Sequence, residues 1–366
     1  MTQTRTPLSP SQLSPAAQRA LTPGPARLMA ARGLAPLPHP RDMVSVLYQL
    51  SLDSDAAVVH AARTTAAGLP DRVLIGALTD SALDPRVLDY FAELHAGRLD
   101  VLQVIIANPG TAGRTIAQLA GRLGTDDVDL IAQNEQRLLS SPEIIGAMFH
   151  NRRARMSTVD RAIELAARNQ VKVPNIPGWE GIARAALSVD TSAAPTPDAD
   201  ADRAFAQAVG DDGGRADTDA EADESGDISA RMPNVAAMTV PQKMRLATLG
   251  NKFVRSTLIR DTNRLVAGAA IRAPGVTDVE AAKYAGNHSL SDDVIKYIAG
   301  RREWTKNYGT KLALVQNPKT PIADAMRLLP HLRDRDMRNV SRSKGIASAV
   351  ATQAKKYLTT RGANRK

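Results

Sequence analysis

The sequence predicts an all-α protein, made of α-solenoid-like helical repeats in two domains that a disordered acidic linker joins. Three observations lead to this prediction. Amphipathic segments follow one another with clear helix start and stop signals, and none shows the sustained alternation of a β-strand. One phrase occurs in both halves, as IIANPGTAGRTIAQLAGRL at 105–123 and LVQNPKTPIADAMRLLPHL at 314–332. Between the halves the composition becomes polar and strongly acidic.

The overall composition limits what such a fold can do. Of 366 residues, 43% are hydrophobic and only 3% aromatic, so the cores consist mainly of small aliphatic side chains with few aromatic residues for a deep pocket. The chain has no cysteine, which excludes disulfides, thiolate metal sites and cysteine nucleophiles. No segment has the roughly 20 apolar residues of a membrane span, so we expect a soluble, cytoplasmic protein without a membrane partner.

Charge is distributed very unevenly along the chain. Residues 1–40 carry a net charge of +4 and residues 41–185 carry −2. Residues 186–228 carry −10, whereas residues 229–366 carry +17, and the whole chain has a formal net charge of +9. The basic C-terminal part is therefore the part that favours an acidic partner.

The N-terminal half is predicted to be an arm followed by a helical domain. Residues 1–40 contain eight prolines among Ser, Thr, Ala and Arg, which predicts a Pro-rich flexible arm. Residues 41–185 form the predicted N-terminal helical-repeat domain. We expect one of its helices to begin with Ser54 as N-cap, and another with Asp84 as N-cap and Pro85 in the first turn.

Residues 186–238 are predicted to form the acidic disordered linker, because they cannot bury enough apolar surface to fold. Phe205 and Val209 nevertheless allow a short helix around RAFAQAV. Three aspartates have the spacing of a calcium loop: Asp198, Asp200 and Asp202. The required Gly and Glu are replaced by Arg203 and Val209, which favours a solvated tether over a calcium site. Residues 239–366 form the predicted basic C-terminal helical-repeat domain.

The repeated phrase predicts how consecutive helices are joined. We expect Asn317 to end the preceding helix in a left-handed conformation, and Pro318 to prevent its continuation. Thr320 would then be the N-cap of the next helix, with Pro321 in the first turn, and Thr111 would have the same role in the other copy. Two helices joined by so short a loop must lie side by side.

Four segments of the C-terminal half are similar to a known kind of helical-repeat protein: GNKFVRSTLIRD, NRLVAGAAIRAP, SDDVIKYIAGRREWTKNYGTKLALVQNPKTP and LLPHLRDRDMRNVSRSKGIASAVATQAKKYL. This region, roughly residues 245–358, resembles a family of uncharacterised bacterial helical-repeat proteins that are similar in design to HEAT-like and leucine-rich-repeat-variant α-solenoids. The resemblance implies a fold and transfers no functional residue. The leucine-rich-repeat variants also bind an iron–sulfur cluster, which a chain without cysteine cannot hold.

Catalytic chemistry has no local signature in this sequence. The six histidines, at positions 39, 60, 95, 150, 288 and 331, form no HExxH pair, and the chain has no phosphate-binding glycine loop and no GxSxG motif. We therefore predict no catalytic residue, cofactor, metal or small-molecule substrate, and expect that the protein is not an enzyme. Histidines near helix ends, such as His150 and His331, are interpreted as structural.

The candidate partner-binding residues combine cations with two aromatic side chains: Arg301, Arg302, Trp304, Lys306, Tyr308, Arg333, Arg335, Arg338, Arg342 and Lys344. Such a combination binds carboxylates or phosphates and stacks on bases. A plainer interpretation stays open. Trp304 and Tyr308, at i and i+4 of a helix, would serve equally well as core, and Asp334 can pair with Arg338 on a solvated face.

The sequence thus predicts a non-catalytic scaffold or adaptor that contacts an acidic protein partner through this basic surface. The alternative is a nucleic-acid-binding accessory protein that uses the same surface. A further hypothesis is that the acidic linker screens the basic surface until a partner displaces it.

Overall fold

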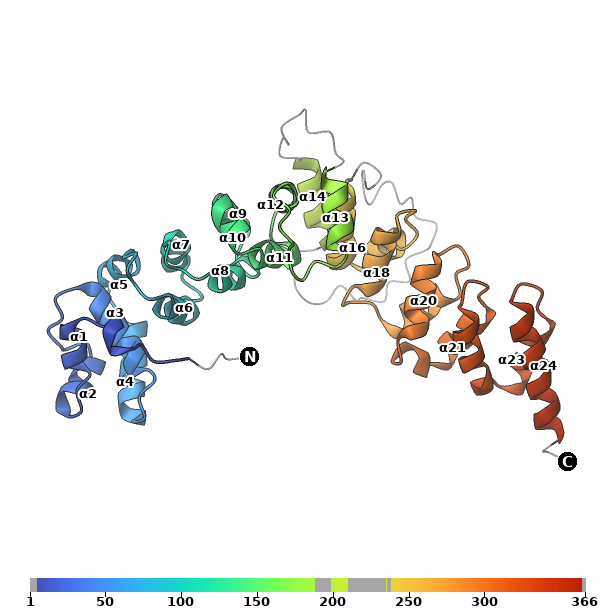
Figure 1. Ribbon diagram of the computed structural model, residues 1–366, viewed down its shortest axis with the longest axis horizontal. Helices are drawn as coiled ribbons and strands as arrows, with labels where there is room; N and C mark the ends of the chain where they lie inside the picture. Colours follow the sequence, from blue (N-terminus) through green and yellow to red (C-terminus); the bar gives the residue numbers. More distant parts are fainter. Residues whose placement is uncertain (1–4, 188–198, 210–234, 236–237, 364–366) are drawn as a thin grey trace. The chain divides into compact units, whose positions relative to one another are not determined.

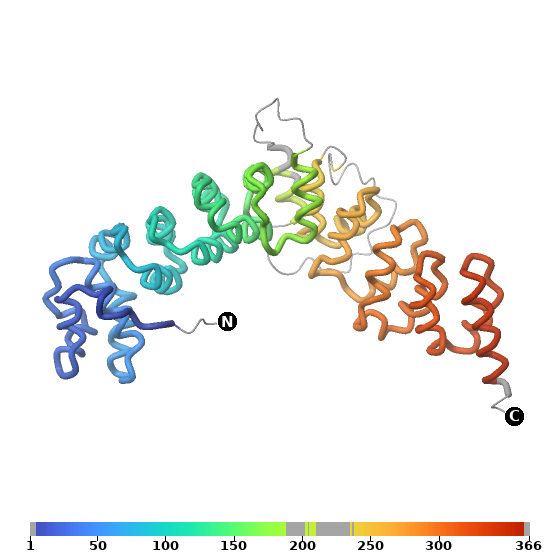
Figure 2. Tube along the Cα trace, viewed as in Figure 1, coloured from blue at the N-terminus to red at the C-terminus, as the bar shows by residue number. Residues whose placement is uncertain are grey.

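The computed structural model describes residues 5–187, 199–209, 235 and 238–363 (Figure 1). Over these residues the regular structure is helical, with 23 α-helices, a few 3₁₀ turns and no strand, which confirms the predicted all-α class. The chain divides into two compact units, Met1–Met148 and Phe149–Lys366. Figure 2 shows the path of the chain, coloured from blue at the N-terminus to red at the C-terminus.

Unit 1 consists of short helices that pack on their neighbours in the sequence; α3 contacts α4, α5 and α6, and α7 contacts α5 and α6. The elements are η1 (Pro10–Gln12), α1 (Pro15–Ala20), α2 (Pro25–Ala31), α3 (Pro40–Leu50), α4 (Ala56–Ala67), α5 (Asp71–Leu78), α6 (Pro85–Leu94), α7 (Leu99–Ala107), α8 (Gly113–Ala120), α9 (Thr125–Ala132) and α10 (Glu135–Ser140). Helix α11 (Glu143–His150) crosses the boundary between the units.

Unit 2 follows the same principle, with α16 packed on α13, α17 and α18, and α23 packed on α24. Its elements are α12 (Met156–Arg168), α13 (Trp179–Leu187), α14 (Ala199–Val209), α16 (Val240–Leu249), α17 (Lys252–Leu258), α18 (Arg264–Arg272), α19 (Asp278–Ala285), α20 (Asp292–Gly300), η3 (Trp304–Lys306), α21 (Tyr308–Gln316), α22 (Ile322–Leu328), η4 (Leu329–His331), α23 (Asp334–Arg342) and α24 (Ser348–Ala363).

The predicted Pro-rich flexible arm is wrong for residues 5–40. This segment forms η1, α1, α2 and the start of α3, and Leu8, Leu13 and Ala17 are buried. Four prolines are the first residues of these helices: Pro10, Pro15, Pro25 and Pro40. A proline there costs no hydrogen bond, because the first-turn N–H has no partner within the helix. The prolines thus begin the helices, whereas the sequence analysis had taken them to prevent helices.

Helix start signals were predicted with mixed success. Asp84 is the N-cap of α6, where its side chain accepts the N–H of Arg86, and Pro85 is the first helical residue, as predicted. Ser54 is not a cap, because the side chain of the next residue, Asp55, accepts the N–H of Ala57 and begins α4. Adjacent Ser and Asp are both good caps, and the residue nearer the helix has taken the position.

Part of the predicted acidic linker is ordered. Helix α14 (Ala199–Val209) packs on α12 and α16, and Phe205 is buried. Asp202 accepts two hydrogen bonds from Ser157 in the first turn of α12, one from the N–H at 2.9 Å and one from the hydroxyl at 2.8 Å. The short helix that Phe205 and Val209 suggested is thus confirmed, and it begins at Ala199, within the segment for which disorder was predicted. Residues 188–198, 210–234 and 236–237 of the predicted linker lie outside the described residues.

The boundary between the units lies at Met148, and not near residue 185 as the sequence suggested. Arg245 of α16 explains the difference. Its side chain is fully buried and donates hydrogen bonds to carbonyl oxygens at the end of α11 and in the following turn, those of Phe149, Asn151, Ala154 and Arg155. Its guanidinium also lies 4.1 Å from the ring centroid of Phe205. Helices on both sides of the predicted linker thus share one core.

The repeated phrase forms the same structure in both units, and this structure differs from the predicted one. Asn108 and Asn317 have extended backbones, with φ of −68° and −85°, where a left-handed one was expected. The predicted N-cap threonines do not cap the next helix. Thr111 donates its hydroxyl to the carbonyl of Ile105 at 2.5 Å, and Thr320 donates to that of Leu314 at 2.6 Å. Both threonines close the last turn of the preceding helix.

The asparagines of the phrase connect each loop to an earlier helix. The side-chain amide of Asn108 donates to the carbonyl of Leu78 at 2.7 Å, and that of Asn317 donates to the carbonyl of Ala285 at 2.8 Å. Both acceptors are the last residues of helices, α5 and α19, and both asparagines are buried. The free carbonyls of a helix end are thus satisfied by the next repeat. We call this contact the asparagine bridge.

In several turns an Asx side chain accepts the backbone N–H of the residue two positions later. Three of these turns in unit 1, at Asp53, Asp80 and Asn108, are 27 and 28 residues apart, and others occur at Asp55 and Asp84. Three in unit 2, at Asp261, Asn287 and Asn317, are 26 and 30 residues apart, and others occur at Asn151, Asn263 and Asn307. Both units thus contain similar turns at similar distances along the chain.

Candidate interaction surfaces

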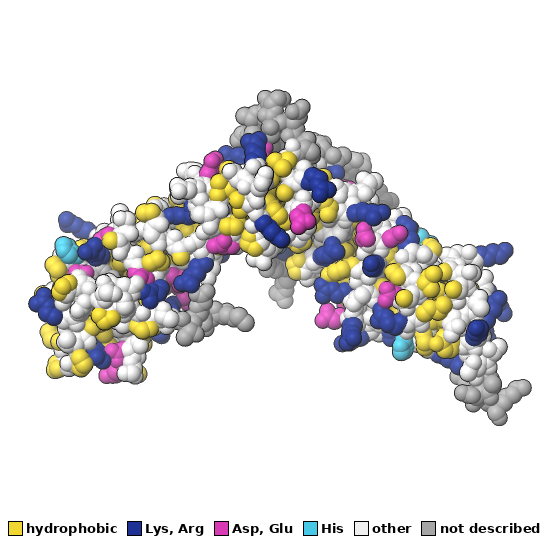
Figure 3. Space-filling model, viewed as in Figure 1, with side chains coloured by type: hydrophobic (Ala, Val, Ile, Leu, Met, Phe, Trp, Pro, Cys, Tyr) yellow, Lys and Arg dark blue, Asp and Glu magenta, His cyan; other side chains and the backbone are white. Residues whose placement is uncertain are grey.

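All eight cationic candidates lie on the surface of unit 2, between the end of α20 and the loop after α23. The exposed side chains are Arg301, Arg302, Lys306, Arg333, Arg335, Arg338, Arg342 and Lys344, and the aromatic Trp304 and Tyr308 are partly exposed. Residues 301–366 contain 16 Lys or Arg and four Asp or Glu, a net charge of +12. Figure 3 shows Lys and Arg side chains, in dark blue, over the C-terminal elements.

Helix α23 separates its apolar and cationic residues onto opposite faces. Met337 and Val340 are completely buried. Arg335, Arg338 and Arg342 stand at i, i+3 and i+7, which places the three exposed side chains on one face of the helix. We call these three residues the arginine face.

The acidic residues of α23 are engaged away from the arginine face. Asp334 forms an ion pair with Arg361 of α24 at 2.9 Å. Asp336 accepts a hydrogen bond from the hydroxyl of Tyr308. Arg338 donates to the backbone carbonyl of Asp334 at 3.2 Å, so the predicted pairing of Arg338 with the carboxylate gives way to a carbonyl contact. Arg361 and Tyr308 lie on other elements, so each carboxylate has a partner away from the arginine face.

A second cationic group surrounds Tyr297 of α20. The guanidinium carbons of Arg272 and Arg301 lie 4.9 and 5.0 Å from the centroid of its ring, which are cation–π distances. Arg301 also donates to the hydroxyl of Tyr297 at 3.0 Å, and Trp304 meets the ring edge-on at 5.9 Å between centroids. The sequence analysis missed Arg272 and Tyr297. The spacing of four residues between Tyr297 and Arg301 was a signal that could have identified the tyrosine.

The sequence had suggested that Trp304 and Tyr308 are neighbours on one helix, but they lie on different elements. Trp304 lies in η3, whereas Tyr308 is the first residue of α21. Arg333 places its guanidinium 4.6 Å from the ring centroid of Tyr308 and donates its backbone N–H to the hydroxyl at 3.0 Å. Desolvation and the bond to Asp336 raise the pKa of Tyr308, so its hydroxyl remains a donor.

These contacts decide what the surface offers to a partner. The ring of Tyr297 already contacts two guanidinium groups and that of Tyr308 contacts one, which leaves less ring surface on which bases could stack. The guanidinium groups themselves are exposed and held in fixed positions. Planar, positioned guanidinium groups favour carboxylates and phosphates as ligands.

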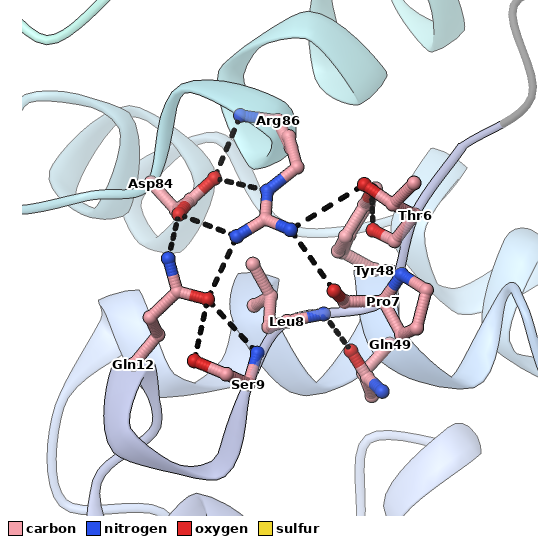
Figure 4. A network of polar contacts seen from close by, with 9 residues as sticks. All are labelled: Thr6, Pro7, Leu8, Ser9, Gln12, Tyr48, Gln49, Asp84 and Arg86. Atoms are coloured by element: carbon pink, nitrogen blue, oxygen red, sulfur yellow. Dashed lines mark hydrogen bonds and ion pairs between the residues drawn. The ribbon is translucent and has the colours of Figure 1, made fainter.

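Unit 1 contains a different kind of contact, in which the N-terminal segment lies on α3 and α6 (Figure 4). Arg86 is at its centre. It donates to the carbonyl of Pro7 at 2.9 Å, to the hydroxyl of Thr6 at 3.4 Å and to the side-chain oxygen of Gln12 at 2.7 Å. Asp84 accepts from Nε of Arg86 at 2.9 Å and from Nη2 at 3.0 Å, which fixes the guanidinium from the other side.

Two residues of α3 complete this contact. Tyr48 donates its hydroxyl to the carbonyl of Thr6 at 2.8 Å, and Gln49 accepts the N–H of Leu8 at 2.8 Å. Burial raises the pKa of Tyr48, so the hydroxyl keeps the proton that it donates. The hydrogen bonds from Arg86 lower the pKa of Asp84, so the carboxylate stays charged. The sequence analysis missed this contact because it had assigned residues 1–40 to a flexible arm.

Among the residues that the structure describes, no group of three or more His, Cys, Asp or Glu side chains has the arrangement of a metal site. Over the same residues, no helix combines the length and the apolar character that a membrane crossing needs.

Comparison with protein-family models, with curated proteins and with solved structures gave no match. The resemblance to a helical-repeat family therefore stays a prediction.

Proposed function

We propose that the protein is a non-catalytic adaptor whose helical repeats stack as in an α-solenoid, and which binds an acidic segment of a partner protein through the arginine face and the adjacent arginine–tyrosine groups. The observation that carries this proposal is the arginine face itself. Three exposed arginines stand on one side of α23, while the two acidic residues of the helix pair elsewhere.

The spacing of the arginine face supports a segment with several carboxylates. Arg335 and Arg342 are seven residues apart, which corresponds to about 10 Å along a helix axis. Carboxylates at alternate positions of an extended chain are roughly 7 Å apart, so two or three of them can meet the three guanidinium groups. Each exposed pair contributes little alone, and several together give a salt-sensitive contact.

Nucleic acid is the second candidate, and the net charge of +12 over residues 301–366 favours it. The partly covered tyrosine rings favour the protein partner instead, because single-stranded nucleic acid is bound largely by stacking on free aromatic faces. The proposal therefore places the protein partner first.

The test compares two full-length triple variants that change the charge equally. One carries Arg335→Glu, Arg338→Glu and Arg342→Glu. The control carries Glu at three exposed arginines elsewhere: Arg72, Arg114 and Arg152. After affinity capture from nuclease-treated extract and mass spectrometry, we expect a defined protein set with the wild type and the control, and its loss with the first variant. Equal loss from both variants would contradict the proposal. Wild-type capture that nuclease abolishes would support the nucleic-acid function.

A further inference from the structure

We propose that the surface formed by Tyr48, Gln49, Asp84, Arg86 and Glu93, here called the α3–α6 face, is a binding site for extended Pro-Leu-Ser segments of partner proteins. In the structure this face is occupied by the chain's own residues 5–13, RTPLSPSQL, which we call the N-terminal segment. The inference concerns unit 1 and does not depend on the arginine face.

The α3–α6 face contacts mainly the backbone of the N-terminal segment. Tyr48 donates to the carbonyl of Thr6, Arg86 donates to the carbonyl of Pro7, and Gln49 accepts the N–H of Leu8. Three successive residues are thus held by main-chain groups that any peptide possesses. Recognition of an extended peptide by other proteins has the same design, with main-chain hydrogen bonds for affinity and a few side chains for specificity.

The side chain that supplies specificity is Leu8. It is 5% exposed, and the other buried residue of the segment, Leu13, lies at its end, outside the part whose main chain the α3–α6 face holds. Pro7 and Pro10 flank the pair Leu8–Ser9, and Ser9 has φ of −74° and ψ of 153°, a polyproline II conformation. Proline favours this conformation before binding, so such a peptide loses little entropy when it docks.

The α3–α6 face is held in place by contacts of its own. Asp84 caps α6 and holds the guanidinium of Arg86 with two hydrogen bonds, and helices α3 and α6 pack on each other. Tyr48 and Tyr90 are in edge-to-face contact, with centroids 5.7 Å apart. None of these contacts involves the N-terminal segment, so the face keeps its geometry when the segment leaves.

The N-terminal segment is attached weakly enough to be displaced. Leu8 and Leu13 are its two buried side chains, and its side-chain contacts include exposed ones, such as the ion pair of Arg5 with Glu93 at 2.6 Å, in which Glu93 is 61% exposed. A short segment with two buried apolar side chains belongs to the parts of a protein that open before the core helices. The segment is therefore a tethered competitor, and a partner peptide of the same chemistry takes its place when the segment opens.

The first experiment measures binding of a labelled, N-acetylated peptide RTPLSPSQL to the full-length chain by fluorescence anisotropy. The proteins are the wild type, Leu8→Ser, and Leu34→Ser as a matched control at an exposed leucine. Leu8→Ser weakens the tethered competitor and leaves the α3–α6 face intact. We expect the peptide to bind this variant at least tenfold more tightly than it binds the wild type or the control.

Two further measurements identify the site. The same peptide with Ser in place of Leu8 is expected not to bind, and adding Arg86→Gln to the Leu8→Ser protein is expected to weaken binding at least tenfold. A Leu8→Ser protein that keeps its helical circular dichroism and does not bind the peptide would overturn the proposal. So would equal binding to all three proteins, which would place the peptide elsewhere.

Hydrogen exchange of the wild type keeps the proposal testable if Leu8→Ser does not fold. We expect the amide of Leu8 to exchange at least a hundredfold faster than those of Val46 and Leu47 in α3, because the N-terminal segment opens by itself. Equal protection would overturn the proposal. A wild-type dimer in sedimentation that Leu8→Ser dissociates would also overturn it, by assigning the face to the N-terminal segment of a second copy.

Discussion

Replacing Arg245 by Met tests whether one buried cation holds unit 2 together. Met replaces the aliphatic stem of the arginine side chain with an apolar one, but it is shorter and donates no hydrogen bond. The buried carbonyls of Phe149, Asn151, Ala154 and Arg155 then lose the guanidinium as donor, although those of Asn151 and Arg155 still accept the backbone N–H groups of Ala154 and Val159. The ring of Phe205 in α14 also loses its contact with the guanidinium.

The expected loss follows from two opposing contributions. A buried carbonyl that loses its donor costs roughly 1.5 kcal/mol and one that loses one of two donors about 0.5 kcal/mol, which gives about 4 kcal/mol for two of each kind. The substitution also removes the cost of burying a charge, the same burial that lowers the pKa of Arg245 to about 9. The carbonyl dipoles and the aromatic ring favour the charged form, so the guanidinium is charged at neutral pH. We expect Arg245→Met to lower the free energy of unfolding of unit 2 by about 3 kcal/mol.

Tryptophan fluorescence during urea unfolding measures this effect in unit 2 alone. Both tryptophans of the chain, Trp179 and Trp304, belong to that unit. With a urea dependence of about 2.5 kcal/mol per molar, a loss of 3 kcal/mol moves the midpoint by about 1 M. Arg260→Met, at an exposed arginine, is the control and should change the midpoint little. A shift for Arg245→Met no larger than that of the control would refute the reasoning.

Three further predictions concern single positions. Asn317→Ala should cost unit 2 about 2 kcal/mol through the lost asparagine bridge, and urea unfolding should show no such loss for the exposed Asn339→Ala. Gly250→Ala should cost about 2 kcal/mol, because the new Cβ would lie 2.6 Å from a backbone carbonyl oxygen; Gly300→Ala, with nothing within 4 Å, should be nearly neutral in the same assay. Burial lowers the pKa of His95 below 6.5, so the unfolded chain binds its proton at higher pH than the folded chain. Thermal stability should therefore fall as the pH drops below about 6.5, and less so in His95→Asn; identical pH profiles would contradict this.

The sequence predicted the helices well where the signal is local. Periodicity gave the all-α class, and the pair Asp84–Pro85 gave the start of α6. The prediction failed where one residue type can have two structural roles. Prolines were taken to prevent helices and instead begin them, as Pro15 and Pro25 do. The threonine of the repeated phrase, Thr320, was expected to begin a helix and instead closes the preceding one.

The residues of the candidate site were likewise predicted only where the signal is local in the sequence. The exposed arginines of α23 could be identified from the sequence, because i, i+3 and i+7 spacing places them opposite Met337 and Val340. The role of Arg245 could not be identified, since its acceptors are 90 to 96 residues earlier in the chain. A charged residue suggests a surface position, and only the fold reveals the carbonyl groups that surround it.

The asparagine bridge has a consequence for how this chain can change in length. Each bridge joins a loop to a helix end 30 or 32 residues earlier. Removing part of this span leaves a buried amide without its carbonyl, whereas removing the loop together with the helix end takes the donor and the acceptor away together. Deletions of about the whole span should thus be tolerated better than shorter ones. The length of each unit would then change in steps, and not residue by residue.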